Sequence, residues 1–211
     1  KAAADFNQVG DTADATANTA SYTLLDNMTI TPGAGDYLLL FTASGDGVSG
    51  SILNYAVHVG GTIVQHTERS FTQESSIPST EMVVMIAAKV SPTGGQDVEV
   101  RWARQAGTGT IVAHERTLTL MKVNAADIFQ ENATADASAT NTADAAISGM
   151  SITPGTATEY LAIFSGSDFY DTIAASENTT YSIYKDGTQA SNSELTAMHE
   201  SSVDIADMAV F

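Results

Sequence analysis

The chain has 211 residues, of which 43% are hydrophobic and 16% charged, a composition typical of a globular protein and not of a disordered one. Twenty-five acidic residues against eight lysines and arginines give a net charge of −17, which argues against nucleic-acid binding because phosphate contacts need clustered cations. The absence of cysteine excludes disulfides and thiolate metal sites, and the absence of any apolar run of about 18 residues argues against membrane insertion.

Short apolar runs separated by turn residues predict β-strands along the whole chain. In chain order these runs cover residues 37–44, 55–59, 62–66, 81–90, 97–102, 116–123, 160–167 and 181–191. Gly60–Gly61 and Asp186–Gly187 supply the positive φ of a two-residue turn, so each predicts a hairpin. Residues 11–20 and 125–129 are candidates for a short helical turn, although threonine and asparagine disfavour helices.

Alternation within these runs places apolar side chains on one face of each strand. The apolar sets are Tyr55, Val57 and Val59; Val98, Val100 and Trp102; and Leu118 and Leu120. Many short strands, with turns about every 8 to 12 residues, indicate an antiparallel β-sandwich. Jelly-roll and immunoglobulin-like sandwiches both fit, and the lack of a Cys–Trp–Cys core argues against a true immunoglobulin domain.

The chain repeats itself. "MTITPGAGDYLLLF" at 28–41 recurs as "MSITPGTATEYLAIF" at 150–164, and residues 55–85 align without gaps with residues 181–211. Matched glycine, proline and tyrosine residues over such a length indicate a duplicated module.

The repeat predicts the fold class and the domain boundaries. We expect an all-β protein of two tandem antiparallel β-sandwich, jelly-roll-like domains, at 1–123 and 124–211. Residues 86–123 have no counterpart in the second domain, which we therefore expect to be incomplete at its C-terminus. The chain is then a fragment of a longer array, or another chain supplies the last strands.

No catalytic motif stands out. His58, His66, His114 and His199 lie in no HExxH frame, and no Gly-x-Ser-x-Gly elbow or phosphate loop occurs. His58 and His66 fall on opposite arms of one hairpin, where a cross-strand contact is the expectation and a metal site the alternative. We therefore expect no catalytic residues, no enzymatic activity and no bound cofactor.

Two acidic loops are candidates for calcium binding. Asp46 in "SGDGVSG", and Asp168 and Asp171 in "SGSDFYD", offer the hard oxygen ligands that calcium prefers. Neither loop matches an EF-hand or a nonapeptide calcium repeat. Simple solvated loops are the alternative.

Charge is unevenly distributed, because residues 124–211 carry thirteen of the acidic residues and only one cation. Arg101 and Arg116 in the first module are candidates for ion pairs with Glu99, Glu115 or acidic residues of a neighbouring module. Such pairs on a surface contribute little to stability. The excess of acidic residues is consistent with a soluble, extracellular protein.

The order "YLLLFTASGDG", "YAVHVGGTIVQHTERSF", "MVVMIAAKV", "GGQDVEVRW" and "ERTLTLMKV" resembles the small jelly-roll modules of virion appendages. These are the modules of phage head fibres, decoration proteins and tail spikes, and they are similar to jelly rolls of the tumour-necrosis-factor and complement type. The resemblance implies a structural protein on a virion exterior, built of repeated sandwiches, that forms homo-oligomers.

The same resemblance implies which partners to expect. They are other copies of the chain, other virion or filament proteins, and surface glycans of a host. Two other functions fit the sequence. One is a subunit of a cell-surface filament or adhesin that assembles by strand addition, and the other is a carbohydrate-binding module.

Overall fold

The computed structural model describes residues 5–73, 82–133, 137–138, 143–155, 159–168, 177–199 and 207–210. The strands of residues 5–123 are β1 (Phe6–Asp11), β2 (Ala15–Ala17), β3 (Thr23–Ile30), β4 (Asp36–Gly47), β5 (Ile52–Val59), β6 (Thr62–Ile63), β7 (Arg69–Thr72), β8 (Met82–Val90), β9 (Val98–Ala106) and β10 (Ile111–Val123). The later elements are the 3-10 turn η2 (Ala125–Asp127), β11 (Ser165–Asp168), β12 (Glu177–Tyr181), β13 (Tyr184–Lys185), β14 (Thr188–Gln189), β15 (Leu195–His199) and β16 (Asp207–Val210). None of the described residues forms a helix long and apolar enough to cross a membrane.

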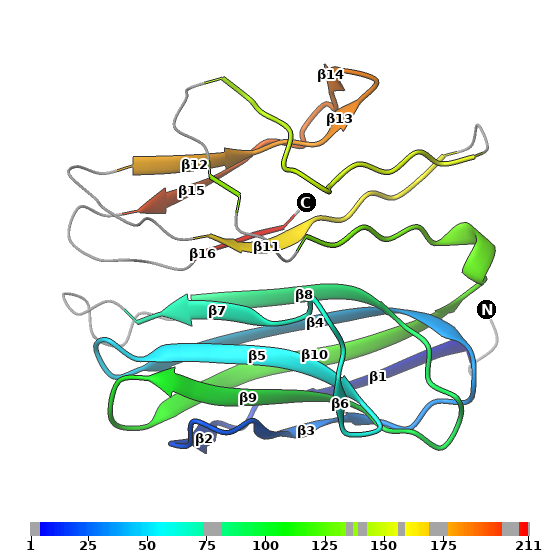
Figure 1. Cartoon of the computed structure of the whole chain (residues 1–211). Coiled ribbons are helices and arrows are strands. Elements are labelled where there is room, and N and C mark those ends of the chain that lie inside the picture. Colours follow the sequence, from blue (N-terminus) through cyan, green and yellow to red (C-terminus); the bar gives the residue numbers. More distant parts are fainter. Residues whose placement is uncertain are drawn as a thin grey trace.

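Two antiparallel sheets form the first sandwich (Figure 1). Sheet A has the strand order β1-β10-β4-β8, with β2 also paired to β10. Sheet B has the order β3-β9-β5, with β6 and β7 paired to successive parts of β5. The prediction of an all-β antiparallel sandwich is confirmed.

The pairing of the strands distinguishes a jelly roll from an immunoglobulin-like sandwich. Among the eight longest strands of the first sandwich, the first pairs with the last (β1 with β10) and the second with the last but one (β3 with β9). The inner pairs follow the same rule, β4 with β8 and β5 with β7. A chain folded back on itself in this nested way has jelly-roll topology.

The core lies between the two sheets and follows the predicted alternation. Val98, Val100 and Trp102 are buried, and so are Leu118 and Leu120 on β10. At the centre, the ring of Tyr55 lies 5.8 Å from Phe41, and 6.0 Å from both Phe71 and Trp102. Aromatic clusters of this kind contribute much of the apolar area that a sandwich buries.

The repeat reappears in the backbone of the two hairpin regions, residues 55–73 and 181–199. His58 pairs with Ile63 and Tyr55 with Arg69; 126 residues later, Tyr184 pairs with Gln189 and Tyr181 with Leu195. Both pairs of the first hairpin region therefore recur in the same register in the second half, residues 124–211.

The turns of the two hairpin regions agree as well. The amide of Val64 donates to the carbonyl of Val57 at 2.8 Å, and the amide of Ala190 donates to that of Ile183 at 2.8 Å. His66 and Asn192 take the same left-handed conformation, with φ of 67° and 62°. The duplicated sequence thus builds the same local structure twice.

Other parts of the repeat differ between the halves. Met28 is buried on β3, whereas its counterpart Met150 lies in a segment without strand structure. The prediction of a strand at 160–167 is wrong for its first part, since β11 begins at Ser165. In the first sandwich β3 pairs with β9 and β4 with both β10 and β8, whereas among the described residues of the second half no strand takes the place of β9 or β10.

The boundary predicted at 123/124 coincides with the end of β10, and the extent of a second domain stays a prediction. Strands β11 and β16 lie against the side of the first sandwich where β7 and β8 end their sheets (Figure 1). The opposite side, formed by β1 and β3, faces away from the second half (Figure 1).

Candidate functional site

The calcium candidates Asp46 and Asp168 lie in separate parts of the structure, and calcium binding at either loop stays a prediction. Asp46 lies on β4 beside His114, whose Nε2 is 3.7 Å from Asp46 Oδ2 and whose Nδ1 is 2.8 Å from Asp14 Oδ1. Asp168 ends β11, where its backbone pairs with Asp207, and Asp171 falls outside the described residues. Within the part of the chain that the structure describes, no three His, Asp or Glu side chains are grouped to hold a metal ion.

The two histidines on the first hairpin have separate contacts. His58 is 6% exposed, and its ring packs edge-on against Tyr22 at 5.7 Å. His66 occupies a left-handed turn position, where its carbonyl accepts a hydrogen bond from Arg69 at 3.1 Å. His199 lies elsewhere, on β15, with its backbone paired to Glu177.

Tyr22 anchors the segment between β2 and β3 to the outward face of sheet B. Its hydroxyl donates to a carboxylate oxygen of Glu68, and Ala56 on the same outward face is fully buried. Burial raises the pKa of Tyr22, and the Glu68 carboxylate raises it further, so the phenol stays protonated and able to donate. The buried His58 ring on this face is thus covered by a tyrosine from the segment between β2 and β3.

The second half makes the same kind of contact with different side chains. Tyr184 occupies the place of His58, and its hydroxyl donates to Asp144, which comes from the segment that corresponds to residues 21–22. A contact between these two regions therefore recurs, through Tyr22 and His58 in the first half and through Asp144 and Tyr184 in the second.

The environment of His58 leads to a testable dependence of stability on pH. Burial lowers the pKa of His58, and Arg101 lowers it further, against the smaller raising effects of the Ala56 backbone and Glu99. Because the unfolded histidine takes up a proton near pH 6.5, the contribution of His58 is complete above that pH and is lost as the pH falls below it. Tyr22, which stays protonated, lies against the ring, and its hydroxyl contacts Glu68.

We expect the variant His58→Gln to lose less stability than the parent between about pH 7.5 and pH 5.5. Urea unfolding, followed by the fluorescence of the single tryptophan, measures this difference at each pH. The same loss of stability in both proteins would show that His58 is not the group responsible.

A buried arginine joins three strands near the β1–β2 turn. Arg116 is 3% exposed, and its Nη2 lies 2.9 Å from Asp11 Oδ2. The guanidinium also donates to the carbonyl oxygens of Ala13 at 2.7 Å, His114 at 2.9 Å and Asp26 at 3.0 Å. Asp11, and not the predicted Glu115, is therefore the ion-pair partner of Arg116. A shift of register between Ala113 and Arg116 turns the arginine side chain inward.

Arg101 behaves as predicted and pairs with Glu99. Its Nε and Nη2 each lie 2.8 Å from Glu99 Oε2, and its side chain is 30% exposed. An exposed pair of this kind contributes about 0 to 1 kcal/mol. Arg101 therefore forms a partly exposed ion pair, whereas Arg116 is a buried structural residue.

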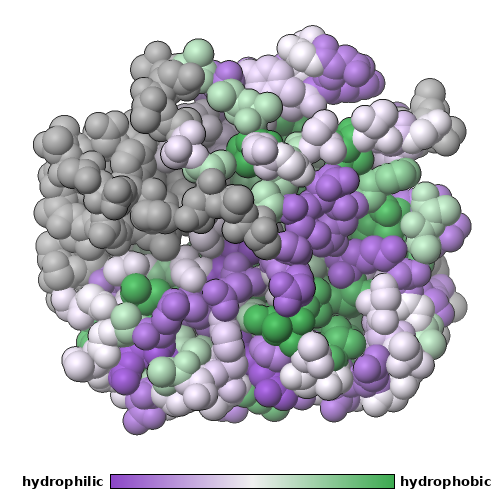
Figure 2. Space-filling view, in the orientation of Figure 1, coloured by the Kyte–Doolittle hydropathy of each residue, from purple (hydrophilic) through white to green (hydrophobic). Residues whose placement is uncertain are grey.

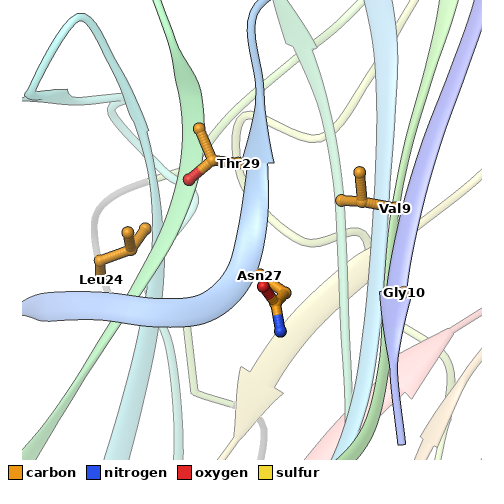
Figure 3. Close-up of a pocket in the computed structure, with 5 residues that line it drawn as sticks. All are labelled: Val9, Gly10, Leu24, Asn27 and Thr29. Atoms are coloured by element: carbon orange, nitrogen blue, oxygen red, sulfur yellow. The ribbon is translucent and has the colours of Figure 1, made fainter.

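An open hollow of about 530 Å³ lies between β1 and β3, where each strand is the edge of its sheet (Figure 3). Val9 and Gly10 line it from β1, and Leu24, Asn27 and Thr29 line it from β3. The Oγ1 atom of Thr29 is buried and has no hydrogen-bond partner among the described residues. Edge strands that flank a hollow can accept an added extended segment.

The outward face of sheet A is uncharged over the central part of β4. The strand registers place on it the residues Phe6, Gln8, Gly10, Leu38, Leu40, Thr42, Ser44, Val83, Met85, Ala87, Lys89, Thr117, Thr119 and Met121. We call these residues the sheet A outer face. The same alternation places Asp36 and Asp46 on this side at the two ends of β4, and Asp36 is paired with the cation Lys89 at 3.4 Å. The outward residues of β4 between these ends, from Leu38 to Ser44, are all uncharged, although the chain carries 25 acidic residues.

The two sheets present different faces to the surroundings. On the sheet A outer face, Phe6 is 47% exposed and Val83 is 70% exposed. Sheet B lies in front in Figure 1, and the same view in Figure 2 shows its side as a mixture of purple and white with a larger green area near β6. Exposed apolar side chains such as these are typical of a surface that contacts another molecule.

Comparison with known proteins places the chain only broadly. The sequence matches no family model and no curated protein. Among solved structures, it is similar to an Eiger TNF from S. frugiperda, with 13% identity, a TM-score of 0.42, and coverage of 60% of this chain and 99% of that one. The sugar-binding C-terminal domain of EclA gives 13% identity, a TM-score of 0.34, and coverage of 51% and 78%.

A third similar structure is the VP2 subviral particle of infectious bursal disease virus, with 7% identity, a TM-score of 0.37, and coverage of 56% of this chain and 32% of that one. These neighbours thus include TNF-like, sugar-binding and viral capsid proteins. At such TM-scores the likenesses carry no weight for function, and the jelly-roll assignment comes from the chain's own strand order.

Proposed function

We propose that this chain is a non-enzymatic structural protein whose jelly-roll modules join copies of itself on the exterior of a virion, as a fibre, decoration or appendage component. The observation that carries the proposal is the sheet A outer face, whose central part is uncharged on a chain of net charge −17, with Asp36 and Asp46 only at the ends of β4. Like charges repel where acidic surfaces meet, so copies associate most favourably through a surface with few acidic residues.

The duplicated hairpin regions support a structural role. Pairs such as His58 with Ile63 and Tyr184 with Gln189 keep the same register, while the side chains at these positions differ. A module that keeps its shape while its side chains vary is suited to building extended structures. The virion location rests on the resemblance of the strand and turn patterns to appendage modules. Immunogold labelling of particles and of host cells distinguishes a virion from a cellular filament.

We expect Leu40→Glu to weaken self-association, because Leu40 lies in the middle of the sheet A outer face, between Thr119 and Ala87. A carboxylate buried there without a partner costs free energy, and we expect the dissociation constant to rise at least about tenfold. Size-exclusion chromatography with light scattering over a series of concentrations measures the change.

The matched control is Val48→Glu, which introduces the same carboxylate at a 42% exposed valine that follows β4 and lines neither the sheet A outer face nor the hollow. It is expected to leave the mass unchanged. A parent protein that stays monomeric at every concentration, or equal effects of the two variants, would refute association through sheet A.

The hollow between β1 and β3 favours a second candidate function, a filament subunit that assembles by strand addition. In that case the extended segment of another copy would pair with β1 or β3. Leu24→Glu would then weaken association, because Leu24 lines the hollow, is 43% exposed and does not lie on the sheet A outer face, so the carboxylate would meet the incoming segment. Association that survives this change and fails with Leu40→Glu selects the first candidate.

A further inference from the structure

The side of the first sandwich where β7 and β8 end their sheets is an unusual edge. Edge strands carry backbone donors and acceptors that can pair with other chains, and proteins protect such edges by charge, bulges or covering segments. Here the second half lies along the edge, with β11 and β16 beside β7 and β8 (Figure 1). The contacts across this boundary show how the two halves are joined.

Arg69, the first residue of β7, makes the most extensive of these contacts. Its Nη2 donates to the carbonyl oxygen of Ser165 at 2.8 Å and to the Oγ of the same residue at 2.7 Å. Its Nη1 donates to the carbonyl oxygens of His66 at 3.1 Å and Glu68 at 2.7 Å. One guanidinium therefore binds the turn before β7 with one nitrogen and the start of β11 with the other. This use of both arms is a property of arginine that lysine lacks.

Backbone donors of both sheets reach the second half as well. The amide of Ser70 on β7 donates to Ser167 Oγ at 3.3 Å, and the amide of Ala87 on β8 donates to Ser165 Oγ at 3.5 Å. Further along β8, the amide of Lys89 donates to the side chain of Gln130 at 2.5 Å. Polar side chains of the second half thus accept hydrogen bonds from backbone amides on the edge strands of both sheets.

The repeat shows that the arginine is not required by the hairpin itself. Arg69 aligns with Leu195, and the pairing of Tyr55 with Arg69 recurs as that of Tyr181 with Leu195. The same local backbone therefore forms with leucine in this position. The residue specific to the first module is explained by what it contacts outside the hairpin, namely Ser165.

We propose that the edge formed by β7 and β8 is a docking surface for the second half of this same chain, and that Arg69 fixes the angle between the two halves. The surface recognises a short serine-containing strand through a carbonyl oxygen and two hydroxyls, at Ser165 and Ser167. Because Leu195 replaces the arginine in the second half, the same set of bonds does not recur there. The docking surface therefore belongs to the first module and not to the second, so the two modules of the pair are not interchangeable.

A crosslink tests the docking in the full chain. The chain has no cysteine, so the double variant Ser70→Cys, Ser167→Cys can form a single disulfide. Oxidation is expected to produce a disulfide within one chain, seen by mass spectrometry of the denatured protein and abolished by reduction. Disulfides only between chains, or none at all, would overturn the proposal.

The role of Arg69 is tested with Arg69→Leu, which copies the residue of the second half. Hydrogen–deuterium exchange is expected to show loss of protection at residues 166–168 and at the amides of Ala87 and Lys89. The matched control is Arg104→Leu, since Arg104 donates to the Gly109 carbonyl within the loop after β9. The emission of Trp102, buried in the first sandwich, verifies that this sandwich stays folded in both variants.

Unchanged exchange at residues 166–168 in Arg69→Leu would overturn the role assigned to Arg69. An equal loss of protection in Arg104→Leu would do the same, because it would indicate general loosening. A shift in the emission of Trp102 in Arg69→Leu would mean that the first sandwich itself is disturbed. In that case the docking is judged from disulfide formation in the Ser70→Cys, Ser167→Cys chain that keeps Arg69.

Discussion

Arg116→Met is expected to lower the free energy of unfolding by about 3 to 5 kcal/mol, the cost of removing one partner from a buried ion pair. The side chain of Arg116 is 1% exposed and lies 2.9 Å from Asp11. Methionine fills a similar volume but leaves the carbonyl oxygens of Ala13, Asp26 and His114 without their shared donor. Denaturant unfolding followed by tryptophan fluorescence measures the loss.

The matched control is Arg101→Met, in which a half-exposed arginine paired with Glu99 is removed. A change of about 0 to 1 kcal/mol is expected there, because water replaces the lost partner. A loss for Arg116→Met no larger than this would show that the guanidinium does not hold β1, β3 and β10 together.

The second large effect is expected at Tyr55, whose ring contacts Phe41, Phe71 and Trp102 at the centre of the sandwich. Tyr55→Ala is expected to cost about 3 to 5 kcal/mol, since it removes an aromatic ring from a close-packed core and leaves a cavity. Thermal and denaturant unfolding of the full chain both report this change.

Tyr55→Phe separates the ring from its hydroxyl. The hydroxyl is buried and has no hydrogen-bond partner among the described residues, and burial raises the pKa of this group, so it stays neutral. Removing an unpaired buried hydroxyl is expected to leave stability unchanged or to increase it. A substantial loss of stability in Tyr55→Phe would reveal a partner for the hydroxyl and contradict this account of the core.

The sequence predicts the strands of the first sandwich well where alternation and turns are strong. Val98, Val100 and Trp102 alternate with charged residues, and all three are buried as this pattern requires. Gly60–Gly61 and Asp186–Gly187 both form the predicted turns with positive φ. Local rules suffice in these places because hairpin register depends on residues close together in the chain.

Contacts between distant residues escape such rules. Asp11 and Arg116 are separated by 105 positions, and Tyr22 reaches Glu68 across 46. The inward turn of Arg116 comes from the shift of register on β10, which no local motif marks. The repeat itself provides one signal, because the exchange of Arg69 for Leu195 in matching hairpins identifies a residue with a role outside the hairpin.

The second half shows the limit of predicting strands from apolar runs alone. Residues 160–164 are as apolar as their counterparts on β4, yet the strand begins only at Ser165. On β4 these positions pair with β10 on one side and β8 on the other. A strand needs neighbours to satisfy its backbone, so its extent depends on partners that a single run does not encode.

Hydroxyl-radical footprinting of the full chain tests the central claim, that copies join through the sheet A outer face. Met85 and Met121 lie on this face and report its exposure through the rate at which they are oxidised. We expect both methionines to be protected at high protein concentration and to lose that protection on dilution and in Leu40→Glu. Oxidation of Met85 and Met121 at the same rate at all concentrations would contradict the claim.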